Sequence, residues 1–532
     1  MKNLGDIMKP FLIPDDSIIP YGRNLAKIDT TKLPLGEKQG HLILVTAMSP
    51  TPKGEGKTTT TIGLGDALCK LGEKSLICLR QPSMGPCFGV KGGATGGGKA
   101  MLTPMESINL NFTGDFHAIT SAHNLLSSMI DNHIHYGNQL KIDLRKITWK
   151  RVMDANDRSL RSITVGLGGP ANGYPREDGF DITVASEVMA IFCLASDLQD
   201  LQNKLGEIII GYSTDKAPIT AKDLKANGAM AAILKNAILP NLVQTLEGNP
   251  ALVHGGPFAN IAHGCNSIIA TKMALGIADF VVTEAGFGAD LGAEKFLNIK
   301  CRQADIWPSC AVLVVTVRGI RHHGKDLESG IVNIKRHVEN LKKFNLPVVV
   351  AINKYTNDTD DEHQWIIDYC RDHLAVECAV NSSWEHGSIG SAVLGEKVIK
   401  ACRSNYLTKH HHLYPSEMGL KKKIETVAKE LYLASVVQFS EKISKDLASF
   451  EEMGFGHLPV CIAKTQYSFS TDPTKLGAAS GHAIEVREVR LSAGAGFVVV
   501  ICGNLMTMPG LPKIPSAENI FIDESGEIKG LF

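Results

Sequence analysis

The stretch TPKGEGKT, residues 51–58, decides the fold: Thr51, Pro52, Lys53, Gly54, Glu55, Gly56, Lys57 and Thr58. An apolar run, HLILVTAM (41–48), precedes it and is typical of a buried strand, whereas IGLGDAL (62–68) follows it and is typical of a helix. A strand, a glycine-rich turn and a helix that opens with Lys-Thr form a phosphate cradle, because the free backbone N–H groups of the turn and of the helix start can bind a polyphosphate. We therefore predict that residues 51–58 bind a nucleoside triphosphate.

Two side chains of this stretch have predicted roles. Lys57 is expected to reach the outer phosphates, and the hydroxyl of Thr58 is expected to bind Mg²⁺. The usual pattern G-x-x-x-x-G-K-[ST] has glycine where this chain has Thr51. A chance loop rich in glycine and threonine is the alternative, but the strand before it and the helix after it favour a phosphate loop.

Length and composition place the chain among globular proteins of several domains. It has 532 residues, of which 44% are hydrophobic and 21% are charged. Lys plus Arg and Asp plus Glu both number 55, so no global charge favours nucleic acid or an anionic membrane. The N-terminus is unlike a signal peptide, and no apolar stretch approaches the ~20 residues that span a bilayer. The twelve cysteines are scattered without metal-type spacing, which is typical of reduced thiols in a cytoplasmic protein.

A second predicted strand, residues 74–79, ends at Arg80. The carboxyl ends of parallel strands meet at the ligand crevice, so Arg80 lies beside the phosphates if its strand neighbours the first one. A surface arginine at a strand end is the alternative. Residues 81–98 then contain seven glycines, at positions 85, 89, 92, 93, 96, 97 and 98. Such a run permits close backbone approach to a ligand and also suits a flexible linker, and its place after Arg80 favours the ligand.

The middle of the chain alternates between predicted helices and strands. Helices are expected over 181–194, opening at Asp181, and over 261–274. A strand over 279–283 leads to Glu284 and Asp290, either of which could contact Mg²⁺ or merely cap the next helix.

The later part of the chain brings two more strands and then a change of pattern. Strands are expected over 310–317 and 346–352, and the second leads into Asn353. A GTPase reads guanine with Asn-Lys-x-Asp, and Thr356 stands at the Asp position, so ATP is preferred. Charged helices dominate 396–450, and the chain becomes β-like and rich in glycine after Pro459. The run His410–His412 is expected to be a solvated bend rather than a metal site.

Several long strings resemble the formate–tetrahydrofolate ligase family, also called 10-formyltetrahydrofolate synthetase, across essentially the whole chain. The matching strings are TPKGEGKTTT (51–60), LRQPSMGPCFGVKGGATGGG (79–98), INLNFTGDFHAI (108–119), DITVASEVMAI (181–191), TEAGFGADLGAEKF (283–296), AKTQYSFSTDP (463–473) and GNLMTMPGLPK (503–513). That family's phosphate loop begins with Thr, which accounts for Thr51.

The resemblance implies an α/β fold with a P-loop NTPase-like, mostly parallel sheet, helices on both faces, and two smaller α/β domains. We expect a nucleotide-binding domain over 1–345, a second domain contributing to the folate pocket over 346–455, and a C-terminal domain over 456–532. The family is typically a cytoplasmic homotetramer that needs ATP and Mg²⁺ and is activated by a monovalent cation, K⁺ or NH₄⁺.

The resemblance also implies an activity in one-carbon metabolism. ATP would convert formate to formyl phosphate, and N10 of tetrahydrofolate, expected in its polyglutamylated form, would then take up the formyl group. Lys57 and Arg80 are the expected catalytic residues, while Phe287, Tyr355 and Trp384 are the expected folate-binding residues. Tyr355 stands where Phe is common in the family, and the segment after Trp384 is poorer in glycine than usual. Without the resemblance, both aromatics are typical of a core.

A different class of protein competes with the ligase. In a regulatory or chaperone-type ATPase, the phosphate loop would drive a conformational change and the later domains would bind a protein partner. The phosphate loop alone does not separate the two classes. The glycine-rich stretch after Arg80 and the match over 463–513 favour the ligase.

Overall fold

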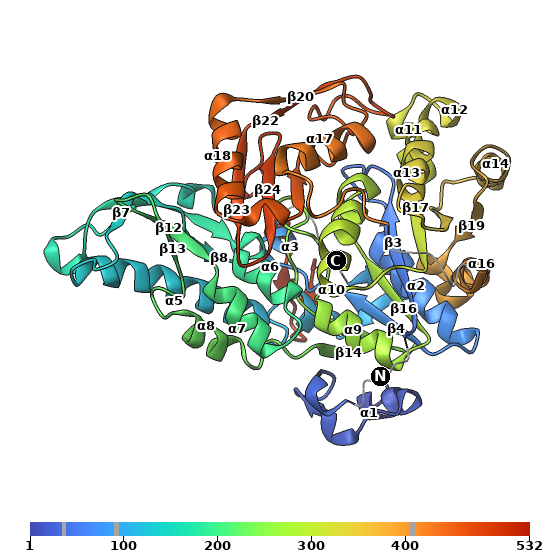
Figure 1. The fold of residues 1–532 in the computed structure, drawn as a ribbon. Helices are drawn as coiled ribbons and strands as arrows, with labels where there is room; N and C mark the ends of the chain where they lie inside the picture. Colours follow the sequence, from blue (N-terminus) through green and yellow to red (C-terminus); the bar gives the residue numbers. More distant parts are fainter. Residues whose placement is uncertain (34–38, 90–94, 405–410, 532) are drawn as a thin grey trace.

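The computed structural model describes residues 1–33, 39–89, 95–404 and 411–531 (Figure 1). A 12-stranded sheet forms its centre. Along the main path the strands lie in the order β1 (Ile18–Pro20), β2 (Ala26–Ile28), β14 (Asn241–Thr245), β15 (Pro250–Val253), β4 (Ser75–Leu79), β16 (Phe280–Glu284), β3 (His41–Ala47), β17 (Cys310–Val315), β18 (Val348–Asn353) and β19 (Glu377–Asn381). The short strands β5 (Gly96–Gly97) and β6 (Ala100–Thr103) attach at β14.

From β15 to β19 every neighbouring pair is parallel, whereas the pairs from β1 to β15 are antiparallel. The predicted mixed α/β fold with a mostly parallel sheet is therefore confirmed. Strands β4, β16, β17 and β18 are buried along their whole length. A parallel sheet covered on both faces needs such continuous apolar runs, which is why these strands could be recognised in the sequence.

Helices cover both faces of the sheet. On β3, Ile43 and Val45 point to one face, where they pack in a cluster with residues of α2 (Lys57–Lys70) and α16 (Ala392–Ser404). Leu42 and Leu44 point to the other face, in the cluster that holds residues of α9 (Ile268–Ile277) and α13 (Val332–Lys342). The alternation of side chains along a strand thus divides the core into two layers.

Two predicted helices begin later than expected. Asp181 lies in strand β11 (Phe180–Ile182), and helix α6 (Glu187–Leu194) begins after Ser186, whose side chain accepts a hydrogen bond from the N–H of Val188. Residues Thr183–Ala185 form a short 3-10 turn between the strand and the helix, and Ser186 is a favoured N-cap residue. Likewise α9 begins at Ile268 after the N-cap Ser267, not at residue 261.

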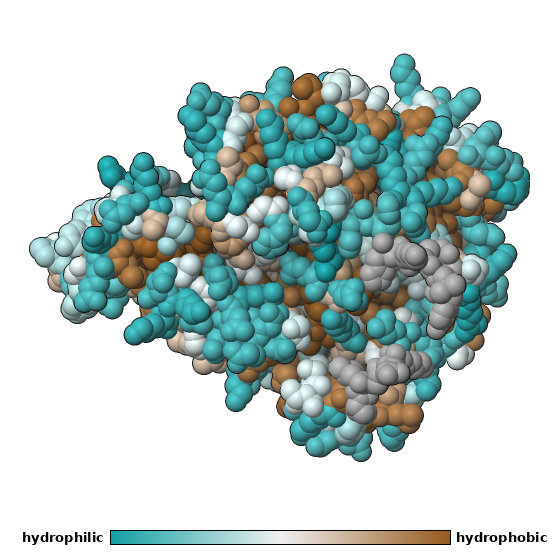
Figure 2. Space-filling model, viewed as in Figure 1, coloured by the Kyte–Doolittle hydropathy of each residue, from teal (hydrophilic) through white to brown (hydrophobic). Residues whose placement is uncertain are grey.

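Two further units pack around the sheet. Helix α5 (Asp115–His135) and the three-stranded sheet of β7 (Ile142–Ile147), β12 (Ile209–Ser213) and β13 (Pro218–Thr220) form an arm that projects to the left in Figure 1. Figure 2 shows hydrophilic residues over most of this face and a hydrophobic area on the arm. Helices α17 (Leu420–Glu430) and α18 (Glu441–Glu452) pack with β20 (Val436–Phe439), β21 (Val460–Ala463), β22 (Ala483–Val486), β23 (Glu488–Ser492) and β24 (Phe497–Ile501) at the top.

The central sheet passes across the predicted boundary at residue 345, because β18 and β19 extend it. The division into three domains stays a prediction. All twelve cysteines lie among the described residues as free thiols, and eleven of them are buried. No helix in the described ranges has the length and apolar character needed to cross a bilayer.

Candidate active site

The predicted phosphate loop connects β3 to α2. Gly54 and Gly56 both have φ +75°, the left-handed region that favours glycine. A Cβ atom on Gly56 would lie 2.2 Å from Nδ2 of Asn353, so this position excludes a side chain. Lys57 is the first residue of α2, and the N–H groups of its first turn face the loop. Pro52 and Lys53 are exposed at the tip, whereas Thr51 and Glu55 are buried at its base.

Glu55 ties the loop to the neighbouring strand ends. Its Oε1 accepts a hydrogen bond from the N–H of Thr51 at 2.7 Å, and its Oε2 accepts one from the Thr316 hydroxyl at 2.5 Å. Its backbone carbonyl accepts from Asn353 Nδ2 at 3.1 Å, and Arg318 donates to the carbonyl of Gly54 at 2.7 Å. The loop is therefore held in shape by residues that follow β17 and end β18.

Glu284 connects the phosphate loop to Arg80. It is the last residue of β16, which lies between β3 and β4 in the sheet. Its Oε2 accepts from the Thr58 hydroxyl at 2.9 Å, and its Oε1 lies 3.9 Å from Arg80 Nη2. The strand of Arg80 is thus not the neighbour of β3, and the intervening strand supplies the carboxylate between them. The Thr58 hydroxyl and the Glu284 carboxylate are oxygen ligands of the kind that Mg²⁺ takes.

Asp290 does not cap the following helix and pairs with a lysine instead. Its Oδ2 forms an ion pair with Lys464 Nζ at 2.9 Å, and both side chains are buried. The turn η7 (Ala289–Ala293) begins after Gly288 without a side-chain cap. Of the two acidic residues that follow the 279–283 run, only Glu284 contacts Thr58.

The Arg80 guanidinium is mostly shielded from solvent at the carboxyl end of β4. Its side chain is 25% exposed, and Nη1 donates to the carbonyl of Pro257 at 3.4 Å. Nε is buried and has no hydrogen-bond partner among the described residues. A Cβ on Gly286 would lie 3.2 Å from Nη1, so glycine leaves the room that the guanidinium needs. The remaining N–H groups can donate to a small anion.

Two buried lysines and Arg80 lie close enough to His263 for their charges to act on it. Lys295 donates to the Ala259 carbonyl at 2.7 Å, and Lys300 donates to Asn266 Oδ1 at 2.9 Å. His263 is fully buried, and this burial, reinforced by the charges of Lys300, Arg80 and Lys295, lowers its pKa well below the usual value. His263 therefore stays neutral in a region that favours a bound anion. The motif scan of the sequence missed these residues, because none of them belongs to a phosphate-loop pattern.

Two of the three predicted folate-binding aromatics, Tyr355 and Trp384, lie near the phosphate loop and the start of α2. The guanidinium of Arg318 lies 4.6 Å from the ring centroid of Tyr355, and burial raises the pKa of the Tyr355 phenol. Trp384 is 54% exposed, and its Nε1 lies 3.2 Å from the position of a Cβ on Gly97. Phe287 has φ +61°, a strained conformation for a bulky residue, of the kind that clusters at functional sites.

The glycine-rich stretch is described only in part. Positions 92 and 93 lie outside the described residues, as do the neighbouring positions 90, 91 and 94. A Cβ on Gly97 would lie 3.9 Å from the Thr59 hydroxyl, so the later part of the stretch runs beside the start of α2. His410 also lies outside the described residues, and within them no three His, Cys, Asp or Glu side chains gather as metal ligands.

Asn353 has a role that sequence reasoning missed. The sequence motif Asn-Lys-x-Asp lacks its Asp here, which argued against guanine recognition. Asn353 itself nevertheless holds the phosphate loop, because its side chain donates a hydrogen bond to the Glu55 carbonyl. Its position at the end of a buried strand was the available signal. Arg318 and Thr316 gave no comparable signal, because their partners lie more than 250 residues away in the chain.

The chain matches the family model described as formate–tetrahydrofolate ligase over residues 1–532. The formate–tetrahydrofolate ligase of Pelagibacter ubique (strain HTCC1062) is 58% identical over 548 residues, which cover 100% of this chain and 97% of the relative. The protein of the same name from Methylorubrum populi is 57% identical over 548 residues, with 100% and 98% covered. That from Methylobacterium sp. (strain 4-46) is 58% identical over 546 residues, with the same coverage.

Proposed function

Because this chain belongs to the formate–tetrahydrofolate ligase family, we propose that it joins formate to N10 of tetrahydrofolate at the expense of ATP. The products are 10-formyltetrahydrofolate, ADP and phosphate, and formyl phosphate is the intermediate. The observation that carries the proposal is the carboxylate of Glu284, which contacts Thr58 of the phosphate loop and lies 3.9 Å from Arg80. A phosphate site and a site for a small anion thus share one edge of the sheet. The alternative of a regulatory ATPase switch finds no support in the full-length match.

Formate requires a preformed pocket. It has three heavy atoms, and at a ceiling of about −1.5 kcal/mol per atom its best affinity is roughly millimolar. Tight binding therefore cannot orient it. The Arg80 guanidinium, which shares the neighbourhood of His263 with the buried Lys295 and Lys300, donates to the carboxylate and holds it toward the phosphate loop.

In the first step, a formate oxygen attacks the γ-phosphorus of ATP, the bond to ADP breaks, and formyl phosphate forms. The carboxylate is already a nucleophile at neutral pH, so this step needs no general base. Lys57 and the N–H groups at the start of α2 stabilise the phosphoryl oxygens. Thr58 and Glu284 would hold the Mg²⁺ ion, which neutralises charge on the phosphates when bound.

In the second step, N10 attacks the formyl carbon, the carbon–oxygen bond to phosphate breaks, and N10 loses its proton. Arg80 stabilises the oxyanion that develops on the formyl oxygen. A flat pterin needs aromatic faces. The aromatic faces would come from Tyr355, which Arg318 connects to Gly54, and from Trp384, which lies beside Gly97. Phe287 would border the same folate pocket.

The remaining properties follow from the family resemblance. We expect K⁺ or NH₄⁺ as an activator, a polyglutamylated folate as the cellular substrate and a homotetramer as the assembly. A cytoplasmic location agrees with twelve free thiols. The division into domains at residues 345 and 455 belongs to the same set of expectations.

The proposal is tested by ADP release with ATP, Mg²⁺, formate and tetrahydrofolate, each omitted in turn. A ligase releases ADP only when both formate and folate are present, whereas hydrolysis indifferent to both would identify a switch. Formate labelled with ¹⁸O tests the intermediate, because one formate oxygen must leave in the phosphate. Phosphate without label would exclude formyl phosphate.

A further inference from the structure

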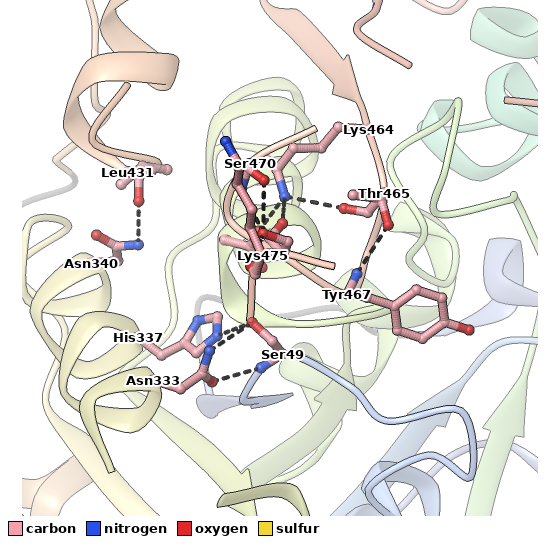
Figure 3. Close-up of polar contacts among 12 residues, drawn as sticks. Ser49, Asn333, His337, Asn340, Leu431, Lys464, Thr465, Tyr467, Ser470 and Lys475 are labelled. Carbon is pink, nitrogen blue, oxygen red and sulfur yellow. Dashed lines mark hydrogen bonds and ion pairs between the residues drawn. The ribbon is translucent and has the colours of Figure 1, made fainter. Parts of the chain in front are cut away.

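Ser49, which lies two residues before the phosphate loop, is held by side chains at each of its polar atoms, and Figure 3 shows the contacts of its N–H and hydroxyl. Its N–H donates to Asn333 Oδ1 at 3.2 Å, and its hydroxyl accepts from Asn333 Nδ2 at 3.1 Å. The hydroxyl also shares a hydrogen bond with His337 Nε2 at 3.0 Å, and the carbonyl accepts from His323 Nε2 at 2.9 Å. Ser49, Asn333 and His337 are fully buried.

Two of these side chains also hold Gly477, in the C-terminal part of the chain. Asn333 Nδ2 donates to the Gly477 carbonyl at 2.7 Å, and the N–H of Gly477 donates to His323 Nδ1 at 3.3 Å. Burial lowers the pKa of His323 to about 4, so the ring is neutral at physiological pH. A neutral ring that donates from Nε2 accepts at Nδ1, which matches both contacts. Asn333 and His323 therefore each join Gly477 to Ser49.

The segment 464–477 is held together by hydrogen bonds between its own residues. Lys464, paired with Asp290, also donates to the Ser468 carbonyl at 2.5 Å. The Ser468 hydroxyl donates to the Lys475 carbonyl at 2.5 Å and lies 2.9 Å from the Ser470 hydroxyl. These bonds fold the segment into a compact loop, so a change at Ser468 moves the chain that leads to Gly477.

We propose that the segment 464–477 sets the nucleotide affinity of the phosphate loop through the Asn333–His323 bridge, with Asn333 as a positioning residue. The path runs from Gly477 through Asn333 to Ser49 and on to Thr51, whose N–H is held by Glu55. Because every polar atom of Ser49 forms a buried hydrogen bond, the residue is fixed in one position. The phosphate loop begins two residues later, so the position of Ser49 determines where the loop starts. This inference rests on the proposed function only in its kinetic readout.

The test compares Asn333→Ala with Asn340→Ala. Asn340 lies on the same helix, is 3% exposed, and donates to the Leu431 carbonyl at 3.0 Å, away from Ser49 (Figure 3). Both variants lose a buried hydrogen bond to a backbone carbonyl, and Asn333→Ala also loses two bonds to Ser49, so both are expected to lower the melting temperature, Asn333→Ala by more. Asn333→Ala is expected to weaken Mg-ADP binding, measured by calorimetry, and to raise the KM for ATP, each about tenfold, with the KM for formate unchanged. Asn340→Ala is expected to keep both values within about twofold.

A double-variant cycle tests the link to the segment. Ser468→Ala is expected to weaken Mg-ADP binding about threefold to tenfold, and the double variant with Asn333→Ala is expected to be no weaker than Asn333→Ala alone. Additive effects would mean that Ser468 and Asn333 act separately, and would overturn the proposal.

Two outcomes separate this inference from the proposed function. If the wild-type protein lacks ligase activity, the proposed function fails, but ADP affinity still tests the bridge. If the wild type is active and Asn333→Ala binds ADP as Asn340→Ala does, the bridge fails alone. Should Asn333→Ala not fold, Ser49→Ala removes only the hydroxyl contacts and is expected to weaken ADP binding about threefold; an unchanged affinity would refute the bridge.

Discussion

Replacing Arg80 by Ala should raise the KM for formate about 100-fold. A hydrogen bond between charged groups contributes about 1.5–3 kcal/mol, which corresponds to about 10–150-fold. The upper part of that range is expected because Glu284 loses its cationic neighbour at 3.9 Å. Unit charges at that separation interact by about 4 kcal/mol at an effective dielectric constant of 20, so the uncompensated carboxylate disfavours a second anion beside it.

The assay is the initial rate of ADP release against formate concentration, at saturating ATP and tetrahydrofolate. The KM for ATP should stay within about threefold, because Lys57 and the loop glycines are unchanged. Arg80→Lys should fall between the wild type and Arg80→Ala, since a lysine keeps the charge and loses the planar pair of donors.

The matched control is Arg161→Ala. Arg161 is partly buried and donates to the Met508 carbonyl at 2.9 Å, outside the site. It should leave the formate dependence unchanged even if the protein is less stable. An Arg80→Ala enzyme with the formate KM of the wild type would remove Arg80 from the formate pocket and would refute the reasoning.

Three further changes test the loop and its helix. Lys57→Ala should abolish turnover while tetrahydrofolate binding, measured by fluorescence titration, stays intact; an equal loss of folate affinity would make Lys57 structural. Gly56→Ala should abolish Mg-ADP binding in calorimetry, because its Cβ would lie 2.2 Å from Asn353 Nδ2 at φ +75°, and normal binding would show that the loop can adjust. Burial raises the pKa of Asp66 to about 7, so its contribution to stability is present in full below pH ~4 and is lost as the pH rises to about 7. The melting temperature of Asp66→Asn should therefore rise relative to the wild type between those pH values, and a constant difference would contradict the assignment.

The phosphate loop could be predicted from sequence because its geometry is local. The two glycines with positive φ lie between a buried strand and a helix. This local pattern alone is enough to define the conformation of the loop. Arg80 could be placed at the edge of the sheet for the same reason, since it directly follows β4. The order of the strands was not available from the sequence. A parallel sheet allows any of several neighbours for β3, and the chain returns 239 residues later, at Phe280 beside His41, to insert β16 next to it.

The residues that sequence reasoning missed share one property, which is that their partners are distant in the chain. Lys464 pairs with Asp290 across 174 positions, and Asn333 meets Ser49 across 284. No spacing rule connects such residues. The roles predicted for Asp290, a contact with Mg²⁺ or a helix cap, therefore came from its neighbours in the sequence alone. The two late helix starts have a different cause: a serine N-cap outweighed the apolar periodicity that extended both helices toward their N-termini.

The predicted folate-binding aromatics show what the family resemblance adds to an interpretation based on residue type alone. Judged by residue type, Tyr355 and Trp384 are typical of a core. Yet Trp384 keeps half of its surface exposed beside a glycine-rich stretch that leaves no room for side chains, an arrangement that a core tryptophan does not need. Tyr355 has one ring face covered by Arg318, which itself holds Gly54. A ligand stacked on Tyr355 would thus contact a ring that Arg318 connects to the phosphate loop. Arg318 would then connect the folate site to the nucleotide site, in addition to the formyl group that is transferred between them.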